Sequence, residues 1–496
     1  MNKGLILSIL IGYFLILVLI SYLTGRKADK DTFYTGNKAS KWYVVAFGMI
    51  GASLSGVTFI SIPGTIANSQ MTYLQIALGY ILGYAIIAFV LLPLYYRLNL
   101  TSIYGFLGVR FGVITHKMGA IFFLLSRVIG ASLRMYLVAN VLQEFVFNEL
   151  GVPFEVTVAI SIALIWVYTH RAGIKTIIWT DTLQTLFMLI SVGLSVYLIS
   201  GELNLALGEI LPALSDNDMG NMWQTEDPMA KSYWIKGLLG GMFITLGMTG
   251  VDQDMMQKNL TCKSKKEAQW NMMSFSVVLF FVNVVFVALG GLLYMYLNSN
   301  PEVMAEWVSR GSDGDELFAV IALSDNLGIA IGVFFIIGLV AAAYSSADSA
   351  LTSLTTSFNL DILNANKKSE EDQIRLRKRT HIFMSIALLL TIIIFKWVKS
   401  DAVIWQLFSA ANFTYGPLLG LFLFGIITKR KVNDIIPLIT CLLVAVTMFF
   451  VNKFSIEIFD GYIFGSELLG INALLVILFL LAFSKKEDGI ELEKEL

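Results

Sequence analysis

The chain of 496 residues contains very little cysteine, histidine or charge. Its two cysteines, Cys262 and Cys441, are too few for a disulfide framework or a cysteine-bound metal site. The three histidines, His116, His170 and His381, stand apart from any cluster of acids and nucleophiles, which argues against an enzyme. Charged residues make up 14% of the chain and the net charge is -1, so the excess of basic residues that nucleic-acid binding needs is missing.

Apolar sequence dominates instead. Hydrophobic residues make up 56% of the chain and aromatic residues 13%, and charge-poor runs of about 20 residues, long enough to cross lipid, recur from end to end. This composition predicts an all-α polytopic protein embedded in a lipid bilayer. We expect about thirteen membrane segments, near residues 5–23, 42–67, 73–96, 118–147, 153–170, 176–200, 233–257, 272–297, 318–360, 381–395, 402–427, 435–451 and 461–483. The ninth is too long for one crossing, so its first residues should form an outside loop or a short surface helix.

The basic residues indicate the orientation of the chain, because cytoplasmic loops of membrane proteins are rich in Lys and Arg. Loops after odd-numbered segments, together with the C-terminal end, hold 26 of the 35, against 7 on the other side. We therefore expect the N-terminus outside and the C-terminus inside a cytoplasmic (inner) membrane, with no cleaved signal peptide. Residues 1–484 should form one transmembrane domain and residues 485–496 a disordered cytoplasmic tail.

Two segments, five apart in order, contain signals for a broken helix. Segment 2 has Gly51 and Gly56 and then Pro63; segment 7 has Gly247 and Gly250. Interrupted helices at matching places in two five-helix halves, here about residues 42–200 and 233–427, indicate an inverted-repeat transporter. Glycines that simply allow close helix packing are the alternative for any single position.

The ninth segment holds a stripe of small and hydroxyl residues at mid-depth. Ala342, Ser345, Ser346 and Ser349 stand at i, i+3, i+4 and i+7, so they share one helical face. Sodium needs several oxygen ligands, and these hydroxyls could combine with backbone carbonyls freed by the broken helix near Gly51 and Leu54. The alternative is that each hydroxyl bonds the carbonyl one turn back.

Two carboxylates lie in predicted spans near this stripe. Asp181 on segment 6 and Asp348 on segment 9 are costly in a membrane unless they have a partner or a function. One interpretation is a second cation site made from Asp181, Ser345, Asp348 and Ser349. The other is an internal ion pair between Asp181 and Arg127, which should lie at similar depth.

Polar positions that should converge between the two halves predict a binding site for a hydroxylated solute. They are Ser53, Ser55, Thr58, Tyr73, Gln75, Asp252, Gln253, Ser409 and Asn412. Arg127 and Arg134 lie two turns apart on segment 4, and an arginine there could bind a substrate carboxylate bidentately. The alternative is an internal pair with Asp181, Asp252 or Asp348.

Four stretches in order along the chain, residues 173–181, 257–269, 340–362 and 416–425, resemble the sodium/solute symporter family, which includes sodium-coupled sugar and sialic acid transporters. The resemblance implies a LeuT-type fold of 5+5 inverted repeats with one extra N-terminal and two extra C-terminal helices. It also implies a shared sodium site, formed by the carbonyls of Gly51, Leu54 and Ala342 and the hydroxyls of Ser345 and Ser346.

Similarity to the sialic acid branch implies an inner cation site at Asp181, Ser345 and Ser349, but this chain has Asp348 where that branch has a hydroxyl. The arginine that binds substrate in that branch falls at Gly130, one turn from Arg134.

Together these observations predict sodium-coupled symport of a sugar, polyol or sugar acid such as sialic acid, by a carrier that works as a monomer. The alternatives are sodium-coupled uptake of a monocarboxylate or another small anion, and a passive channel. A receptor is disfavoured because no sizeable soluble domain follows the last segment.

Overall fold

The computed structural model describes residues 3–26, 30–170, 173–324, 327–397 and 403–486, and within these ranges its regular secondary structure is helical apart from two isolated bridges. The helices of the apolar segments are α1 (Lys3–Gly25), α3 (Trp42–Ser53), α4 (Gly56–Ser69), α5 (Tyr73–Ile86), α6 (Leu92–Arg97), α8 (Val113–Leu142), α9 (Phe154–Thr169), α10 (Ile174–Glu202), α12 (Trp234–Thr245), α13 (Gln253–Asn259), α14 (Lys265–Ser299), α17 (Ile329–Ser357), α18 (Glu370–Phe395), α19 (Val403–Ile427), α20 (Ile435–Lys453) and α22 (Leu468–Ala482). Shorter helices connect them: α2 (Lys30–Thr35), α7 (Gly105–Arg110), α11 (Ile210–Asp216), α15 (Pro301–Ser309), α16 (Gly314–Leu323) and α21 (Ser455–Ile458).

The helices correspond to the predicted segments. In the described residues, nine helices are long and apolar enough to cross a membrane, or up to 11 if each of two bent pairs counts as one span; α9 and α22 are shorter apolar helices. The ninth segment is split into α16 and α17, as its length predicted. However, α16 is not a surface helix, because residues 317–322 are buried and Gly314 lies against the Gly64 backbone of α4. The predicted tail lies outside the described residues from 487 onward.

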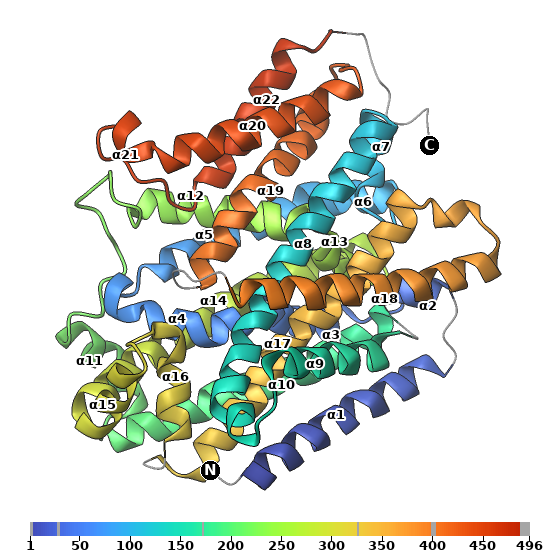
Figure 1. The fold of residues 1–496 in the computed structure, drawn as a ribbon. Coiled ribbons are helices and arrows are strands. Elements are labelled where there is room, and N and C mark those ends of the chain that lie inside the picture. The colour runs from blue at the N-terminus through green and yellow to red at the C-terminus, as the bar shows by residue number, and fades with distance from the viewer. Residues whose placement is uncertain (1–2, 27–29, 171–172, 325–326, 398–402, 487–496) are drawn as a thin grey trace.

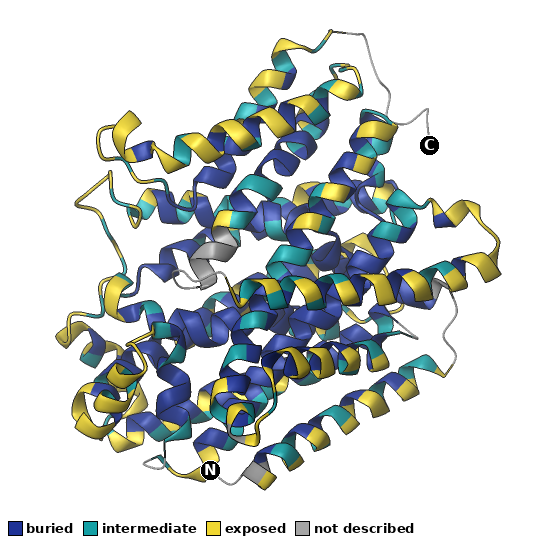
Figure 2. Cartoon of the chain, in the orientation of Figure 1, coloured by how far each residue is buried: buried dark blue, intermediate teal, exposed yellow. Residues whose placement is uncertain are grey.

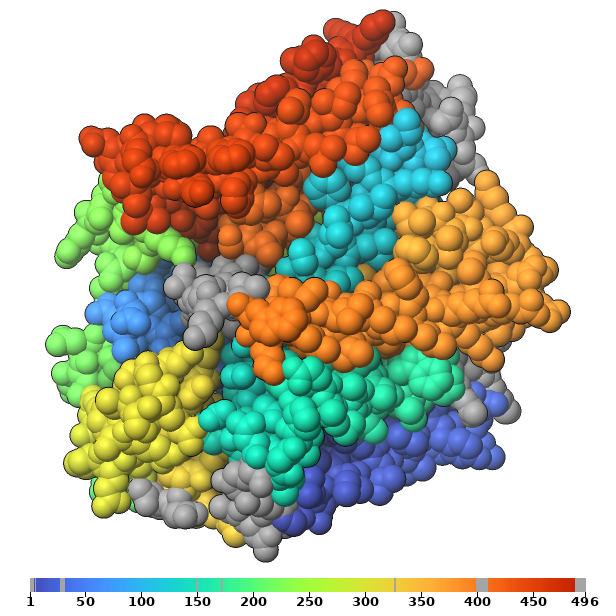
Figure 3. All heavy atoms as spheres, in the orientation of Figure 1, coloured from blue at the N-terminus to red at the C-terminus, as the bar shows by residue number. Residues whose placement is uncertain are grey.

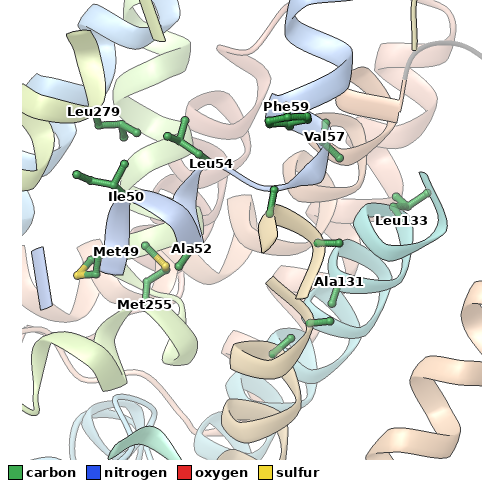
Figure 4. Packing of buried hydrophobic residues seen from close by; sticks show 14 of the residues in the cluster. Met49, Ile50, Ala52, Leu54, Val57, Phe59, Ala131, Leu133, Met255 and Leu279 are labelled. Atoms are coloured by element: carbon green, nitrogen blue, oxygen red, sulfur yellow. The ribbon is translucent and has the colours of Figure 1, made fainter. Parts of the chain in front are cut away.

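Both predicted helix breaks are present. Segment 2 bends by 55° between α3 and α4, and segment 7 bends by 72° before α13. At the first break the backbone of Leu54 (φ -82°, ψ 83°) and Ser55 (φ -77°, ψ 177°) leaves the helical conformation. Figure 4 shows this link as a narrow strip of chain between Leu54 and Val57. At the second break a short π-helical turn over residues 246–250 precedes Asp252, whose carboxylate caps α13 by accepting from Met255 N–H at 3.1 Å.

Helix α17 forms the centre of the protein. Every residue from 338 to 357 is buried, and α17 packs against α3, α4, α8 and α10. By contrast, α1 runs along one edge of the molecule with mixed buried and exposed positions (Figures 1 and 2). The space-filling view in Figure 3 shows α9 and α18 side by side on one face, where they cover the scaffold around α17.

Glycines allow two helices to approach closely beside the breaks. A Cβ on Gly241 of α12 would lie 2.0 Å from the carbonyl oxygen of Ile76 on α5, and one on Gly79 would lie 2.1 Å from that of Leu238. The packing interpretation of glycine is therefore correct at these positions. It holds α5 against α12 and so ties the two halves of the molecule together.

Candidate sodium and substrate site

The break in segment 2 lies next to the hydroxyl stripe of α17. A Cβ on Gly56, the first residue of α4, would lie 3.8 Å from the Cα of Ala343. Gly51, near the end of α3, instead faces α10, where its N–H donates to Thr185 Oγ1 at 3.0 Å. The start of α4, directly after the irregular backbone at residues 54–55, thus lies beside α17, and a cation site between the two segments needs this proximity.

The two predicted hydroxyl ligands have different partners. Ser346 Oγ donates to the Ala342 carbonyl at 3.4 Å, a long contact of the kind expected when a helix hydroxyl turns back by one turn. Ser345 Oγ donates to Asp181 Oδ1 at 2.6 Å. Because its proton points to Asp181, the lone pairs of Ser345 Oγ remain available to a cation. These oxygen donors fit a hard monovalent cation such as sodium.

Asp181 lies at the junction of three helices. Besides Ser345, it accepts from Ser349 Oγ at 3.4 Å, and its Oδ2 forms an ion pair with Lys258 Nζ at 2.8 Å. Lys258 comes from α13, and both charged side chains are almost fully buried. The predicted association of Asp181 with Ser345 and Ser349 is therefore observed. The alternative prediction, an ion pair between Asp181 and Arg127, is wrong. Lys258 reaches Asp181 because the bend before α13 turns this short helix into the protein.

Asp348 points to a neighbouring position in the same buried region. Its Oδ2 accepts from Tyr168 Oη at 2.9 Å and from Thr180 Oγ1 at 3.5 Å. Its Oδ1 is buried and, among the described residues, has no hydrogen-bond partner. In these residues, therefore, Asp348 has no arginine to neutralise it.

A small cavity of about 70 Å³, partly open to solvent, lies at the break and is lined in part by residues 53–55. Predicted substrate residues that line it are Ser53, Ser55, Thr58, Tyr73 and Arg134. They come from α3, α4, α5, α8 and the irregular link. Thr245, Thr249 and Met255 of the second broken segment line the cavity as well, so both broken segments and α8 meet here. The lining combines polar with apolar side chains, as small-molecule sites usually do.

The two arginines of α8 have different surroundings. Both arginines line the cavity, but Arg127 forms an ion pair with Asp254 and lies 3.9 Å from Asp252 Oδ2, so its charge is compensated by the protein. Arg134 lines the cavity and is 8% exposed, its Nε is buried without a hydrogen-bond partner, and it forms no ion pair with a described carboxylate. Internal pairing is therefore correct for Arg127 and wrong for Arg134.

Five predicted substrate residues do not line this cavity, and four have other partners. Asp252 caps α13 and accepts from Tyr415 Oη at 2.5 Å, and Gln253 bonds the backbone at Thr101 and Ile103. Gln75 Nε2 donates to the Met222 carbonyl at 2.5 Å. The Asn412 carbonyl accepts from Asn472, and Ser409 is exposed.

Sequence reasoning missed several residues at both sites. Tyr80 and Tyr84 line the cavity together with Tyr73, from which they are seven and eleven residues away on α5. This helical spacing of phenols was the signal that could have found them. Asp254 and Lys258 gave a weaker signal, because they lie beyond the break in sequence that resembles a cytoplasmic loop.

Comparison with known proteins identifies the family of this chain. A model of the Sodium:solute symporter family matches residues 33–435. The chain belongs to this family. Similar proteins include the sodium/sialic acid symporter SiaT of Proteus mirabilis, 25% identical over 85% of this chain and 84% of the relative, and the sodium/sialic acid symporter NanT of Aliivibrio fischeri, 26% identical over 83% and 80%. Sodium-coupled monocarboxylate transporter 1 of Xenopus laevis is 25% identical over 81% of this chain and 64% of that protein.

Solved structures agree on the fold of the symporter. A substrate-bound, outward-open sodium-coupled sialic acid symporter superposes with a TM-score of 0.82, at 22% identity over 98% of this chain and all of that chain. Mhp1, a nucleobase-cation-symport-1 family transporter, superposes with a TM-score of 0.58, at 15% identity over 91% and 93%. The predicted LeuT-type all-α fold is confirmed. So is the prediction of a sodium-coupled solute symporter, an integral membrane transporter rather than an enzyme.

Proposed function

We propose that this symporter carries a hydroxylated organic acid, a sugar acid such as sialic acid, together with sodium. The observation that carries the proposal is Arg134, a buried cation that lines the cavity and forms no ion pair with any carboxylate of the described residues. A charged group at such depth is costly, so a ligand carboxylate is its natural partner. The guanidinium fork matches a carboxylate bidentately.

Hydroxyl groups around Arg134 support a polyhydroxylated substrate. Ser53, Ser55, Thr58 and Tyr73 line the cavity, and Tyr73 Oη lies 3.2 Å from Tyr80 Oη. Such groups both donate and accept, so they suit the alternating hydroxyls of a sugar. SiaT and NanT, the similar proteins named above, are sodium/sialic acid symporters.

A monocarboxylate is the second candidate, since the same arginine would bind it and a sodium-coupled monocarboxylate transporter is among the relatives. The hydroxyl lining favours the sugar acid. A small apolar acid would leave these buried hydroxyls without partners, and each unsatisfied group costs about 1–3 kcal/mol.

For the coupling ion we assign one sodium site to the carbonyls of Gly51, Leu54 and Ala342 and the hydroxyls of Ser345 and Ser346. Bound sodium would supply a positive charge that holds α3 and α4 against α17. Solute binding on the far side of the same break then favours the state in which the bundle that contains α3, α4, α12 and α13 rocks against the scaffold. This is alternating access by a carrier that works as a monomer, with the N-terminus outside and the C-terminus inside the inner membrane.

The energetics depend on the charge of the solute. A neutral sugar moving with one sodium ion gains about 2.3 kcal/mol from a 100 mV potential, whereas one sodium ion with a monoanion moves no net charge. For an acid, therefore, the sodium gradient alone drives uptake. Each tenfold sodium gradient, worth about 1.4 kcal/mol, then sustains about a tenfold gradient of the acid.

Uptake into proteoliposomes tests the proposal. Labelled sialic acid, a neutral hexose, a polyol and a short monocarboxylate are each supplied with an inward sodium gradient, and with choline in its place. We expect sodium-dependent accumulation of the sugar acid, in excess of the other three solutes. Equal uptake of the neutral hexose would contradict the role of Arg134, and uptake that persists in choline would contradict sodium coupling.

A further inference from the structure

The buried cluster around Asp181 contains a cation that belongs to the protein itself. We propose that the ammonium of Lys258 occupies the place of a second coupling cation, so that this symporter binds a single sodium ion in each cycle. The inference rests on the sodium site proposed above. It goes further by fixing the number of ions, and by assigning a role to a residue outside both predicted sites.

Lys258 Nζ lies 2.8 Å from Asp181 Oδ2, and the relative exposure of the two side chains is 2% and 1%. The other neighbours of Asp181 are Ser345 Oγ at 2.6 Å and Ser349 Oγ at 3.4 Å. These are the oxygens that an inner cation site at Asp181 would use. Since the carboxylate already contacts an ammonium, this donor set does not fit a second sodium ion at the same position.

The charges of the cluster also favour a single sodium ion. In their ionised forms Asp181 and Asp348 would bring two negative charges into the buried region, against one positive charge from Lys258. Tyr168, which donates to Asp348, is neutral, and Arg127 is paired with Asp254 on another face. One sodium ion beside Ser345 therefore makes the cluster neutral. Two would leave an excess positive charge in a region where uncompensated charge is strongly unfavourable.

The position of Lys258 explains why this cation does not count as cargo. It is carried by α13, the short inner half of a broken helix, while Asp181 and the serines belong to α10 and α17. An ammonium fixed to the chain compensates the carboxylate in each cycle but is never released to the cytoplasm. It contributes charge balance to the site and no free energy from the sodium gradient.

Equilibrium binding of ²²Na⁺ to the purified full-length protein measures the number of ions without any solute. We expect one sodium ion per chain, with a Hill coefficient of about 1, and loss of this binding in Ser346→Ala. Two sodium ions per wild-type chain would overturn the inference while leaving the proposed function intact. No sodium binding at all would overturn both. One bound sodium ion without uptake of the acid would refute only the proposed substrate.

Variants of the cluster test the role of Lys258 directly. In Lys258→Met two carboxylates remain without the ammonium, so we expect two bound sodium ions and a Hill coefficient that rises toward about 2. Lys258→Arg keeps the positive charge and should bind one sodium ion, like the wild type. The double variant Lys258→Met with Asp348→Asn removes one charge of each sign, so it should also bind one sodium ion. An unchanged count in a folded Lys258→Met protein, or two ions in the double variant, would refute the proposal.

Discussion

Replacing Arg134 by methionine separates a substrate-binding role from a structural role, because the two predict opposite changes in stability. The substitution keeps a long flexible side chain on α8 and removes the guanidinium that lines the cavity. If Arg134 binds a substrate carboxylate, the variant should lose affinity for the sugar acid and keep its sodium site. The sodium ligands lie on other helices, so their binding is a separate measurement.

The size of the loss follows from the contacts that the guanidinium would make. A hydrogen bond to a charged group contributes about 1.5–3 kcal/mol, and removal of one partner of a buried charge pair costs about 2–5 kcal/mol. A value of about 3 kcal/mol corresponds to affinity that is about 140-fold weaker. Arg134→Lys keeps the charge but not the fork, and we expect a smaller loss of about tenfold.

Stability should change in the opposite direction. An arginine at the centre of a membrane helix costs about 2.5–3.5 kcal/mol on insertion scales, and Arg134 forms no ion pair with a described carboxylate that would offset this. Methionine should therefore raise the free energy of unfolding by about 1 kcal/mol or more. Arg127→Met, the same change two turns earlier, should lower it by about 3–5 kcal/mol, because Asp254 and Asp252 lose their partner.

The assay combines thermal melting in detergent with binding of labelled sialic acid by scintillation proximity, for wild type, Arg134→Met, Arg134→Lys and Arg127→Met. Weaker binding together with a higher melting temperature in Arg134→Met is the expected pair of results. A lower melting temperature in Arg134→Met would refute the reasoning, since it would mean that the guanidinium stabilises the protein rather than the complex. Unchanged affinity would refute it equally.

Three further predictions concern other parts of the molecule. Ser346→Ala should raise the sodium concentration for half-maximal uptake at least tenfold, since a ligand oxygen is lost from the proposed sodium site; unchanged sodium dependence would refute this assignment. Gly241→Ala should lower stability by about 1–3 kcal/mol in thermal melts, because the new Cβ would meet a backbone carbonyl at 2.0 Å, whereas Gly193→Ala, with nothing within 4 Å, should be neutral or stabilising. Burial raises the pKa of Cys262 to about 12, so at pH 8 only about one thiol in 10⁴ is ionised. In a Cys441→Ala background N-ethylmaleimide should then label Cys262 only after denaturation, and rapid labelling of the folded protein at pH 8 would contradict its burial.

Local sequence was sufficient to predict the architecture. Apolar runs of membrane-spanning length predicted the segments, and glycines predicted that segments 2 and 7 are broken. The structure has these breaks at residues 54–55 and 251–252, while Pro63, another predicted signal, lies inside α4. Both signals are local, since a helix of lipid-spanning length and a backbone that leaves it depend on residues within a few turns. The hydroxyl stripe of α17 was equally predictable, because positions i, i+3, i+4 and i+7 share a face in any helix.

Pairing between charges could not be predicted in the same way. From sequence, Arg127 was a candidate partner for Asp181, yet Arg127 pairs with Asp254 and Asp181 pairs with Lys258. Arginine and lysine side chains are long, so several acids at similar depth are within reach until the packing of helices is known. The bend before α13 selects among them, because it carries Asp254 and Lys258 inward on one short helix.

The sequence alone thus determined the class of the protein, its helices, which two segments are broken and the residue types that favour a sodium ion. Only the tertiary structure decided which acid meets which base, and which polar residues line the cavity rather than cap a helix. The physical reason is that the first group of features depends on neighbours along one helix. The second depends on the rotation and bending of helices against one another, and these are set by the packing of the whole bundle.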